Sequence, residues 1–330
     1  MIKRLLSFLW MLIAGARACL YSKNIFKSHG SSIRIISVGN ISLGGAGKTP
    51  FVLWLIKRFM DKGLKTAVIE RGYKSGLPKK ECKMWQKGKD QIGPILIGDE
   101  PQMLWEALPS GARLCVCSDK TKGVMEVEKK WSDSDVIVVD DGFQHLRLKR
   151  NINIVLMEAI GAFEDRIFPM GRLREAYSSL KRADIIVFTK ADVLKERDLL
   201  IEKAKNFNPN IKIFFADSIF KSSIDLKGKK VFPLSSIYNP KYFHLKLKEA
   251  GADFERYMAF RDHYAYDLKT VKMIIDNAKN LGVKYVALTS KDWVKIKPIL
   301  SDELKVGIEF IECSYEHTLE NEEEFLNCSI

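Results

Sequence analysis

Hydrophobic residues along the chain gather in short runs, and the stretches between them carry apolar positions at helical spacing. Residues 48–60 contain Phe51, Leu55 and Phe59 and are followed by Gly63, a pattern typical of a helix that ends at a glycine. The short runs are typical of buried strands. They cover residues 33–38, 65–70, 112–117, 135–140, 151–157 and 184–188. Strands that alternate with helices predict an α/β fold with a mostly parallel sheet.

The pattern changes near residue 211. Two short β-like runs, at 211–215 and 231–234, flank residues rich in Lys, Ser and Gly, which predicts a short β-like hinge. A helix-like stretch at 240–251 and an apolar strand at 283–289 follow the hinge. These features predict a second, smaller α/β domain after the hinge.

The chain is therefore expected to have three parts. Residues 1–30 form an N-terminal helical region, residues 31–222 form the domain with the parallel sheet, and residues 223–330 form the smaller domain. The acidic tail at 316–324 is expected to be a solvated helix.

The N-terminal region combines positive charge with apolar residues. The first sixty residues carry nine Lys or Arg and no acidic residue, and residues 5–16 are nearly all apolar. Twelve helical residues span about 18 Å, less than the roughly 30 Å of a bilayer core, so this run is not expected to cross a membrane. A signal peptide and a core-packing helix are the alternatives. The pattern favours an amphipathic helix that lies in the membrane interface, with its basic residues on anionic lipid.

Composition narrows the class of protein. The 330 residues are 46% hydrophobic, which suits two domains with sizeable cores. The six cysteines show no Cys-x-x-Cys pair and no histidine spacing suited to zinc, a pattern typical of a reduced, cytosolic protein. The net charge is +13, but no basic stripe with interleaved aromatic residues is present. We expect no nucleic-acid partner, because a lipid surface explains the same charge.

The stretch ISLGGAGKTP at residues 41–50 resembles a phosphate-binding loop between a strand and a helix. Its end matches the Walker A pattern, but Ser42 stands where the opening glycine is usual. The alternative is a plain turn with an exposed lysine. The strand–loop–helix context favours a nucleotide site, because glycine N–H groups at a helix N-terminus bind anions. The residues predicted to bind the nucleotide are Gly44, Gly45, Ala46, Gly47, Lys48 and Thr49.

Two of these residues have more definite roles. Lys48 is expected to reach the β- and γ-phosphates, and the Thr49 hydroxyl is expected to bind Mg²⁺. The apolar run at 135–139 ends in Asp140 and Asp141, as expected of a Walker B strand whose carboxylates hold Mg²⁺. Together the two motifs predict a P-loop NTPase-like sheet with helices on both faces.

The segment Thr189-Lys190-Ala191-Asp192 resembles the Asn-Lys-x-Asp sequence with which GTPases read guanine, with Thr in place of Asn. A GTP-binding switch is therefore one alternative function, and a generic ATPase is another. A switch also needs Asp-x-x-Gly at the end of the Walker B strand, and Val139 occupies the position that the spacing to Gly142 requires. This departure counts against a switch.

Further motifs, in order along the chain, resemble the tetraacyldisaccharide 4′-kinase family of the lipid A pathway. They lie at residues 39–50, 71–73, 98–101, 140–145, 171–175, 262–264 and 289–292. In that family a serine or threonine commonly stands at the loop entrance, which accounts for Ser42. The resemblance extends to about residue 298. Ala46 departs from a common Thr, Met170-Gly171-Arg172 from a small-residue stretch, and Ser290 from a usual Glu.

The resemblance implies a reaction and a location. ATP, with Mg²⁺, is expected to phosphorylate the 4′-hydroxyl of a tetraacyl glucosamine disaccharide 1-phosphate. The expected partners are this membrane lipid and the anionic surface of the inner membrane, and no obligate protein partner is implied. The enzyme is expected to be peripheral, on the cytoplasmic face of that membrane. The resemblance also implies that the smaller domain closes over an active-site cleft between the two domains.

The resemblance also implies catalytic residues. Asp99 and His263 are expected to form a pair in which the imidazole orients the carboxylate that accepts the hydroxyl proton. From the residues alone, Asp99 fits a helix cap before Pro101 as well as it fits a base. Glu100 is expected to join Asp140 and Asp141 near Mg²⁺. The arginines expected to contact phosphate are Arg71, Arg172 and Arg174.

Overall fold

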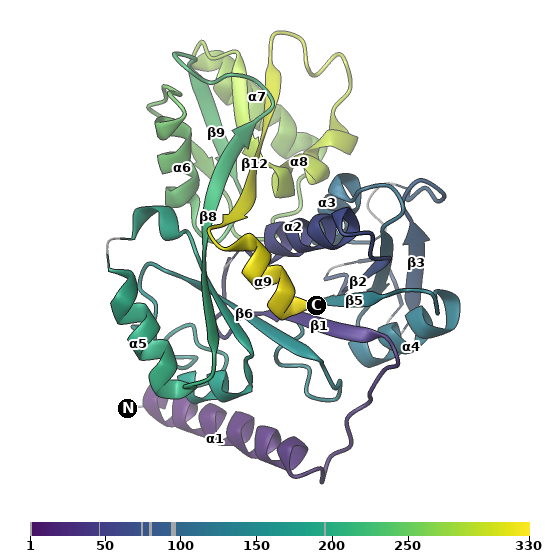
Figure 1. Cartoon of the computed structure of the whole chain (residues 1–330). Helices are drawn as coiled ribbons and strands as arrows, with labels where there is room; N and C mark the ends of the chain where they lie inside the picture. The colour runs from purple at the N-terminus through teal and green to yellow at the C-terminus, as the bar shows by residue number, and fades with distance from the viewer. Residues whose placement is uncertain (1, 46, 74, 79–80, 94–96, 195) are drawn as a thin grey trace.

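The computed structural model describes residues 2–45, 47–73, 75–78, 81–93, 97–194 and 196–330. Within these residues one twelve-stranded sheet runs through the whole molecule (Figure 1), in the order β10-β9-β11-β12-β8-β7-β6-β1-β5-β2-β4-β3. The strands from β7 to β3, with their helices, are called the first lobe. The strands β9, β10 and β11, with theirs, are called the second lobe.

The first lobe contains the strands that the hydrophobic runs predict. They are β1 (Arg34–Gly39), β2 (Thr66–Glu70), β4 (Arg113–Cys117), β5 (Val136–Asp140), β6 (Ile152–Glu158) and β7 (Ile185–Thr189). All six are parallel to their neighbours in this group. Most of their residues are buried, because helices cover both faces of the sheet. The edge strand β3 (Cys82–Gln86) is antiparallel to β4.

Helices cover both faces of this sheet, as the sequence predicts. On one face α2 (Lys48–Asp61), α3 (Asp99–Ala107) and α9 (Glu322–Ser329) pack on alternate strand residues such as Ile36 and Val138. On the other face lie α4 (Lys120–Lys130), the short helix η1 (Tyr177–Arg182) and α5 (Arg197–Phe207).

The second lobe is a smaller α/β layer. Its strands are β9 (Val231–Ser235), β10 (Met258–Ala259) and β11 (Tyr285–Thr289). Its helices are α6 (Pro240–Glu249), α7 (Leu268–Asn280) and α8 (Ser290–Ile296). Helix α7 packs on one face of these strands, and α6 packs on the other.

The lobes are joined by two long strands. β8 (Lys212–Ser222) and β12 (Glu309–Leu319) are antiparallel to each other, and β8 pairs with β7 whereas β12 pairs with β11. The short run at 211–215 is thus the beginning of an eleven-residue strand. The boundary at residues 222 and 223 stays a prediction.

The expectation of a solvated acidic tail is wrong. Residues up to Leu319 belong to β12, and α9 returns to the first lobe, where Phe325 is fully buried. The Phe325 ring lies 5.8 Å from that of Phe51 and 5.5 Å from that of Trp54. The acidic residues misled the prediction because they occupy the outer side of α9, where Glu322 pairs with Arg58 at 2.7 Å.

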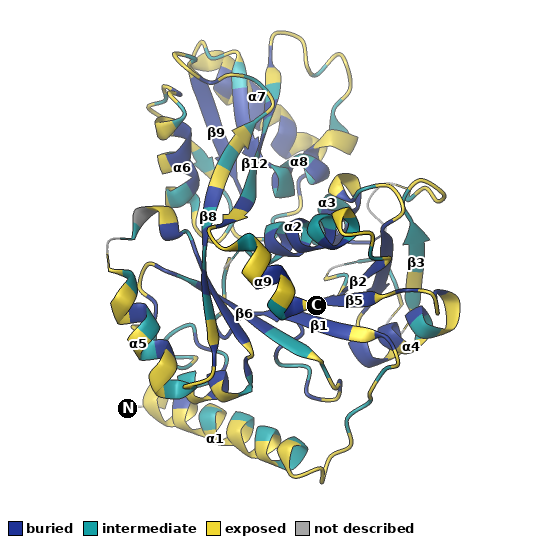
Figure 2. Ribbon diagram, viewed as in Figure 1, coloured by how far each residue is buried: buried dark blue, intermediate teal, exposed yellow. Residues whose placement is uncertain are grey.

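The N-terminal helix α1 (Ile2–Ser22) is longer than its apolar run and lies along the base of the first lobe (Figure 1). Its 21 residues are long and apolar enough to cross a membrane by length and composition, so the argument from a short run is wrong. The helix continues to Ser22 because no Gly or Pro follows the run before that residue. Among its described residues only Ser7 is buried (Figure 2), which contradicts a core-packing helix.

The expectation that all cysteines are reduced also needs correction. Cys82 and Cys117 form a disulfide between β3 and β4. The sequence pattern did not predict β3, whose register with β4 places these two residues opposite each other.

Candidate active site

The predicted phosphate-binding loop connects β1 to α2. Gly44 has φ +114° and Gly47 has φ +72°, conformations that favour glycine. A side chain at Gly47 would also come within 3.1 Å of the His317 ring, which lies on β12. Lys48 begins α2, so the loop amides and the helix N-terminus point at one place. Ala46, predicted to bind the nucleotide, lies outside the described residues.

Lys48 belongs to a charged cluster within the first lobe. Its Nζ lies 3.2 Å from Asn40 Oδ1 and 3.5 Å from Asp141 Oδ1. Both Asp141 oxygens accept from Arg174 Nη1 at 2.9 Å. Burial alone would raise the pKa of Asp141, but Lys48, Lys120 and Arg174 hold it well below the usual range. We call Lys48, Asp141 and Arg174 the one-lobe cluster.

Two further carboxylates lie beside this cluster. Asp140 ends β5 and Glu70 ends β2, and both are almost completely buried. Asp140 Oδ1 and Glu70 Oε1 are buried oxygens without a hydrogen-bond partner among the described residues. Burial, followed by the nearby charge of Asp140, raises the pKa of Glu70 well above its usual value. Lys120 begins α4 and is also buried, which lowers its pKa.

These buried oxygens fit a hard cation. Mg²⁺ usually takes one or two protein carboxylates and completes its shell with phosphate oxygens and water. The described residues contain no group of three or more His, Cys, Asp or Glu that could hold a metal by themselves. Asp140, with the Thr49 hydroxyl in the first turn of α2, is therefore suited to Mg²⁺ that arrives with a nucleotide.

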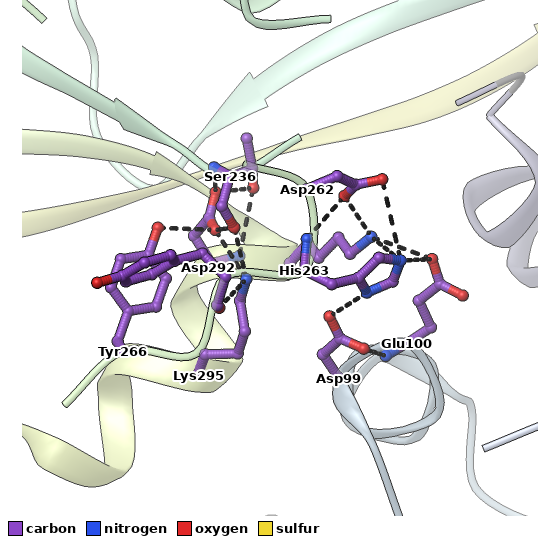
Figure 3. A network of polar contacts seen from close by, with 11 residues as sticks. Asp99, Glu100, Ser236, Asp262, His263, Tyr266, Asp292 and Lys295 are labelled. Atoms are coloured by element: carbon purple, nitrogen blue, oxygen red, sulfur yellow. Dashed lines mark hydrogen bonds and ion pairs between the residues drawn. The ribbon is translucent and has the colours of Figure 1, made fainter. Parts of the chain in front are cut away.

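Asp99 lies at the start of α3, directly after Gly98. Gly98 has φ +95°, and a side chain there would come within 2.6 Å of the Tyr73 carbonyl oxygen, so only glycine fits. Asp99 Oδ1 accepts from the Glu100 N–H at 3.1 Å, and Oδ2 faces His263 Nδ1 at 2.9 Å (Figure 3). The N-cap of α3 is Gly98 and α3 has no side-chain cap hydrogen bond, so the capping interpretation of Asp99 is wrong.

The environment of Asp99 favours its charged form. Burial would raise its pKa, but the hydrogen bond from His263 and the charge of Lys291 outweigh burial and lower it. Asp99 is therefore ionised in neutral solution and can accept a proton.

His263 comes from the second lobe, in the loop before α7, and has φ +56°. Lys291 Nζ on α8 lies 3.2 Å from His263 Nε2. An ammonium group only donates, so Nε2 accepts and Nδ1 carries the proton that is donated to Asp99. Lys291 Nζ also lies 3.2 Å from Glu100 Oε1 and 3.1 Å from Asp262 Oδ1. We call Asp99, His263 and Lys291 the two-lobe cluster.

A buried network holds α8 in place. Asp292 is fully buried and accepts from Tyr266 OH at 3.0 Å, from Thr289 Oγ1 at 2.7 Å and from the Ser236 N–H at 3.0 Å (Figure 3). Lys295 pairs with Asp292 at 3.1 Å. Because Lys291 is on the same helix, this network fixes the backbone that carries it.

The remaining predicted residues differ in how close they lie to the phosphate-binding loop. Glu100 contacts Lys291 rather than a loop residue. Arg172 pairs with Asp165 at 2.6 Å, and it lines one cavity together with the loop residues Gly44 and Gly45. Arg71 is exposed at the end of β2, where its backbone N–H donates to Glu70 at 3.1 Å.

Sequence reasoning assigned no role to four charged residues of the site. These are Glu70, Lys120, Asp262 and Lys291. Glu70 could have been found, because it ends an apolar run just before Arg71-Gly72. Lys291 lies in a motif that the family resemblance identified, but its partners come from distant parts of the chain.

Comparison with known proteins gives a family. The model of the tetraacyldisaccharide-1-P 4′-kinase family matches residues 1–327. The chain is 35% identical over 306 residues to tetraacyldisaccharide 4′-kinase of Desulfotalea psychrophila, covering 88% of this chain and 86% of that protein. It is 34% identical over 310 residues to the enzyme of the same name from Cytophaga hutchinsonii, covering 90% and 85%.

A solved structure agrees with these relatives. LpxK from Aquifex aeolicus, crystallised in complex with ATP, is 27% identical to the chain. The TM-score is 0.76, and the match covers 98% of this chain and 96% of that one. The similarity therefore extends over both lobes and the N-terminal helix.

Proposed function

The chain belongs to the tetraacyldisaccharide-1-P 4′-kinase family, and we propose that its two clusters divide the work of the phosphoryl transfer. The enzyme is an ATP-dependent phosphotransferase of lipid A biosynthesis, and its substrate is an acylated disaccharide phosphate. The observation that carries the division is that the phosphate-binding loop lies within the first lobe, whereas the 2.9 Å contact between Asp99 and His263 joins both lobes.

The one-lobe cluster is the phosphate side of the site. Lys48 supplies positive charge to the β- and γ-phosphates, and the loop amides supply N–H donors. Arg174 holds the Asp141 carboxylate through both oxygens, which keeps this anion directed at Lys48. We assign Arg172 to a phosphate contact because it lines a cavity with Gly44 and Gly45. We also assign Arg71 to a phosphate contact, because it lies next to Glu70 at the end of β2.

Mg²⁺ belongs to the same side. The ion neutralises charge on the transferred phosphoryl group when it is bound. Asp140 and Thr49 are the residues proposed to hold it, and the partnerless oxygens of Asp140 and Glu70 support this assignment. Asp141 and Glu100, which are engaged by Lys48 and by Lys291, are proposed to act from the periphery of the ion.

Asp99 is the proposed proton acceptor. Its charged form is favoured, and His263 fixes one of its oxygens at 2.9 Å. With the imidazole proton on Nδ1, His263 orients the carboxylate toward the cleft. The sugar hydroxyl would lose its proton to Asp99 as its oxygen attacks the γ-phosphorus, while the bond from the γ-phosphorus to the β–γ bridging oxygen breaks and ADP leaves.

The N-terminal helix suggests how a lipid reaches this cleft. Ser7 Oγ donates to the Ile167 carbonyl at 2.9 Å, and Trp10 Nε1 donates to the Arg174 carbonyl at 2.8 Å, so one side of α1 is attached to the first lobe. Its other side exposes large apolar side chains. These are Ile2, Leu5, Leu6, Phe8, Leu9, Leu12 and Ile13. We propose that α1 lies in the interface of the cytoplasmic leaflet of the inner membrane, with its basic residues on anionic lipid.

The reaction is tested with the full chain. Labelled γ-phosphate should move from ATP to a detergent-solubilised tetraacyldisaccharide 1-phosphate, with GTP measured in parallel. Nucleotide hydrolysis that is indifferent to the lipid would instead support the generic ATPase. A variant Lys241→Met, altered on the exposed side of α6, serves as a matched control.

The membrane assignment is tested separately. Deleting residues 1–24 should weaken flotation with anionic vesicles, and raising the salt concentration should weaken flotation of the intact chain. Circular dichroism should show that the truncated chain is still folded, since α1 is mostly exposed. Vesicle binding that persists after truncation would contradict the assignment.

A further inference from the structure

The guanine-reader-like segment Thr189–Asp192 lies at the nucleotide side of the sheet. It follows β7, and only β6 separates β7 from β1, whose end carries the phosphate-binding loop. Two strand spacings amount to about 10 Å, a distance that a nucleotide with its phosphates on the loop can bridge. In parallel sheets such ligands lie outside the carboxyl ends of the strands.

Contacts connect this segment to the loop. Lys190 forms an ion pair with Glu158, the last residue of β6. Glu158 lines the same cavity as the loop residues Gly44 and Gly45. Lys190 has φ +58°, a left-handed conformation that is uncommon for a residue with a side chain and that is often found at functional sites. The segment is thus built into the wall of the nucleotide side.

The carboxylate of this segment is already occupied. Asp192 Oδ2 lies 2.7 Å from Lys246 Nζ, and Lys246 belongs to α6 of the second lobe. Lys246 is buried and is also held by Glu249 at 2.9 Å. The ring of Tyr242 lies 4.5 Å from Lys190 Nζ and 5.5 Å from Lys246 Nζ, so it lies close to both ammonium groups.

This pairing bears on which purine the Asp192 carboxylate can recognise. Guanine presents the N1–H and N2–H₂ donors, which an unpaired carboxylate accepts together, whereas adenine has an acceptor at N1. We propose that Lys246 is a specificity-determining residue: by pairing with Asp192 it withdraws the carboxylate from guanine and so favours ATP over GTP. The inference rests on the proposed function only in taking the nucleotide to be bound at this loop.

The test measures nucleotide affinity of the full chain without lipid. Isothermal titration with ATP and with GTP compares wild type, Lys246→Met, Asp192→Asn and the double variant, with Lys241→Met as the control on α6. Lys246→Met should raise the affinity for GTP relative to ATP by about tenfold, the order of one hydrogen bond to a charged group. Asp192→Asn alone should change this ratio little, and the double variant should lose the gain.

Several results would overturn the proposal. An unchanged ratio in folded Lys246→Met, or equal losses for both nucleotides, would show that the pair only joins the lobes. If Lys246→Met does not fold, Lys246→Gln keeps a side chain of similar length and should still raise the ratio. A gain that persists in the double variant would also contradict a role for Asp192. Failure of lipid phosphorylation by wild type with ATP would count against the proposed function. The nucleotide affinities are measured without lipid, so they would still decide whether Lys246 sets the preference for ATP.

Discussion

The two charged clusters of the cleft are built in different ways. Lys48, Asp141 and Arg174 all belong to the first lobe, on segments that end a strand, begin a helix or contact the loop. Asp99 begins a helix of the first lobe, whereas His263 and Lys291 come from the second lobe, 164 and 192 positions further along the chain. The one-lobe cluster does not depend on the position of the second lobe. The two-lobe cluster exists only where the lobes meet.

This difference has a functional consequence. Nucleotide binding should depend on the one-lobe cluster, and proton transfer should depend on the two-lobe cluster. Under the proposed division, the kinase would align its base only when the second lobe is in place over the first. Variants of the two clusters should therefore separate binding from catalysis.

The largest expected effect is that of Asp99→Ala. Loss of the proton acceptor should lower kcat by about 10²–10⁴-fold, the usual range for general base catalysis. Affinity for ATP should change little, because the one-lobe cluster is intact. Steady-state kinetics with the acylated disaccharide phosphate and titration calorimetry with ATP measure the two quantities.

A double variant sharpens this result. Asp99→Ala with His263→Ala should cost far less than the product of the single losses, since the two residues act as a unit. A full product would mean that the residues work separately. If Asp99→Ala itself were mild, Asp99 would not be the proton acceptor.

Lys48→Ala tests the one-lobe cluster. Its charge is proposed to lie where the transition state is most anionic, so kcat should fall by about 10²–10³-fold. ATP affinity should fall as well, in contrast to Asp99→Ala. The control is Ser42→Gly, which restores the usual Walker A residue and should be mild. More than about a tenth of the activity remaining in Lys48→Ala would contradict the loop assignment.

The same difference explains how much the sequence could predict. The strands, the loop and the helix α2 follow from local spacing, and the one-lobe cluster mostly lies at their ends. Asp99 and His263 could be paired only through family resemblance, because no local pattern relates residues 164 positions apart. Lys291 and Glu70 were given no role for a related reason. The residues that they contact, such as His263 for Lys291 and Asp140 for Glu70, are far from them in the sequence. The position of α9 was mispredicted because its acidic residues outnumber the two buried apolar ones.

His317 connects β12, which joins the two lobes, to the phosphate-binding loop of the first lobe. It lies on β12, and its Nε2 is 3.2 Å from the Gly47 carbonyl oxygen of the loop. Burial lowers its pKa to about 4. The unfolded chain, with an ordinary histidine pKa near 6.5, binds a proton first as the pH falls, so the free energy of unfolding should decrease between about pH 6.5 and 4.

The size of this loss is on the order of 3 kcal/mol for one such group. Urea unfolding at several pH values should show it, and His317→Gln, which keeps a donor for Gly47, should have a flatter profile. Burial also lowers the pKa of His145 to about 4, and this residue titrates in both proteins, so the difference between the two profiles isolates His317. Identical profiles would contradict the prediction.

The smallest expected effect concerns Lys291, the part of the two-lobe cluster that does not touch Asp99. Lys291→Met removes the donor 3.2 Å from His263 Nε2 and leaves the 2.9 Å contact between His263 and Asp99. The imidazole then loses a contact that helps to fix its tautomer, so kcat should fall by about tenfold with ATP affinity unchanged. Lys291→Arg, which keeps the charge, should restore part of the rate. The nitrogen chemical shifts of His263 should show a single Nδ1–H tautomer in wild type and a mixture in Lys291→Met.

In an Asp99→Ala background the Lys291 substitution should cost almost nothing more, because it acts through the pair. A loss of ATP affinity equal to the loss of rate would place Lys291 with the phosphate side instead, and the division between the clusters would fail at this residue.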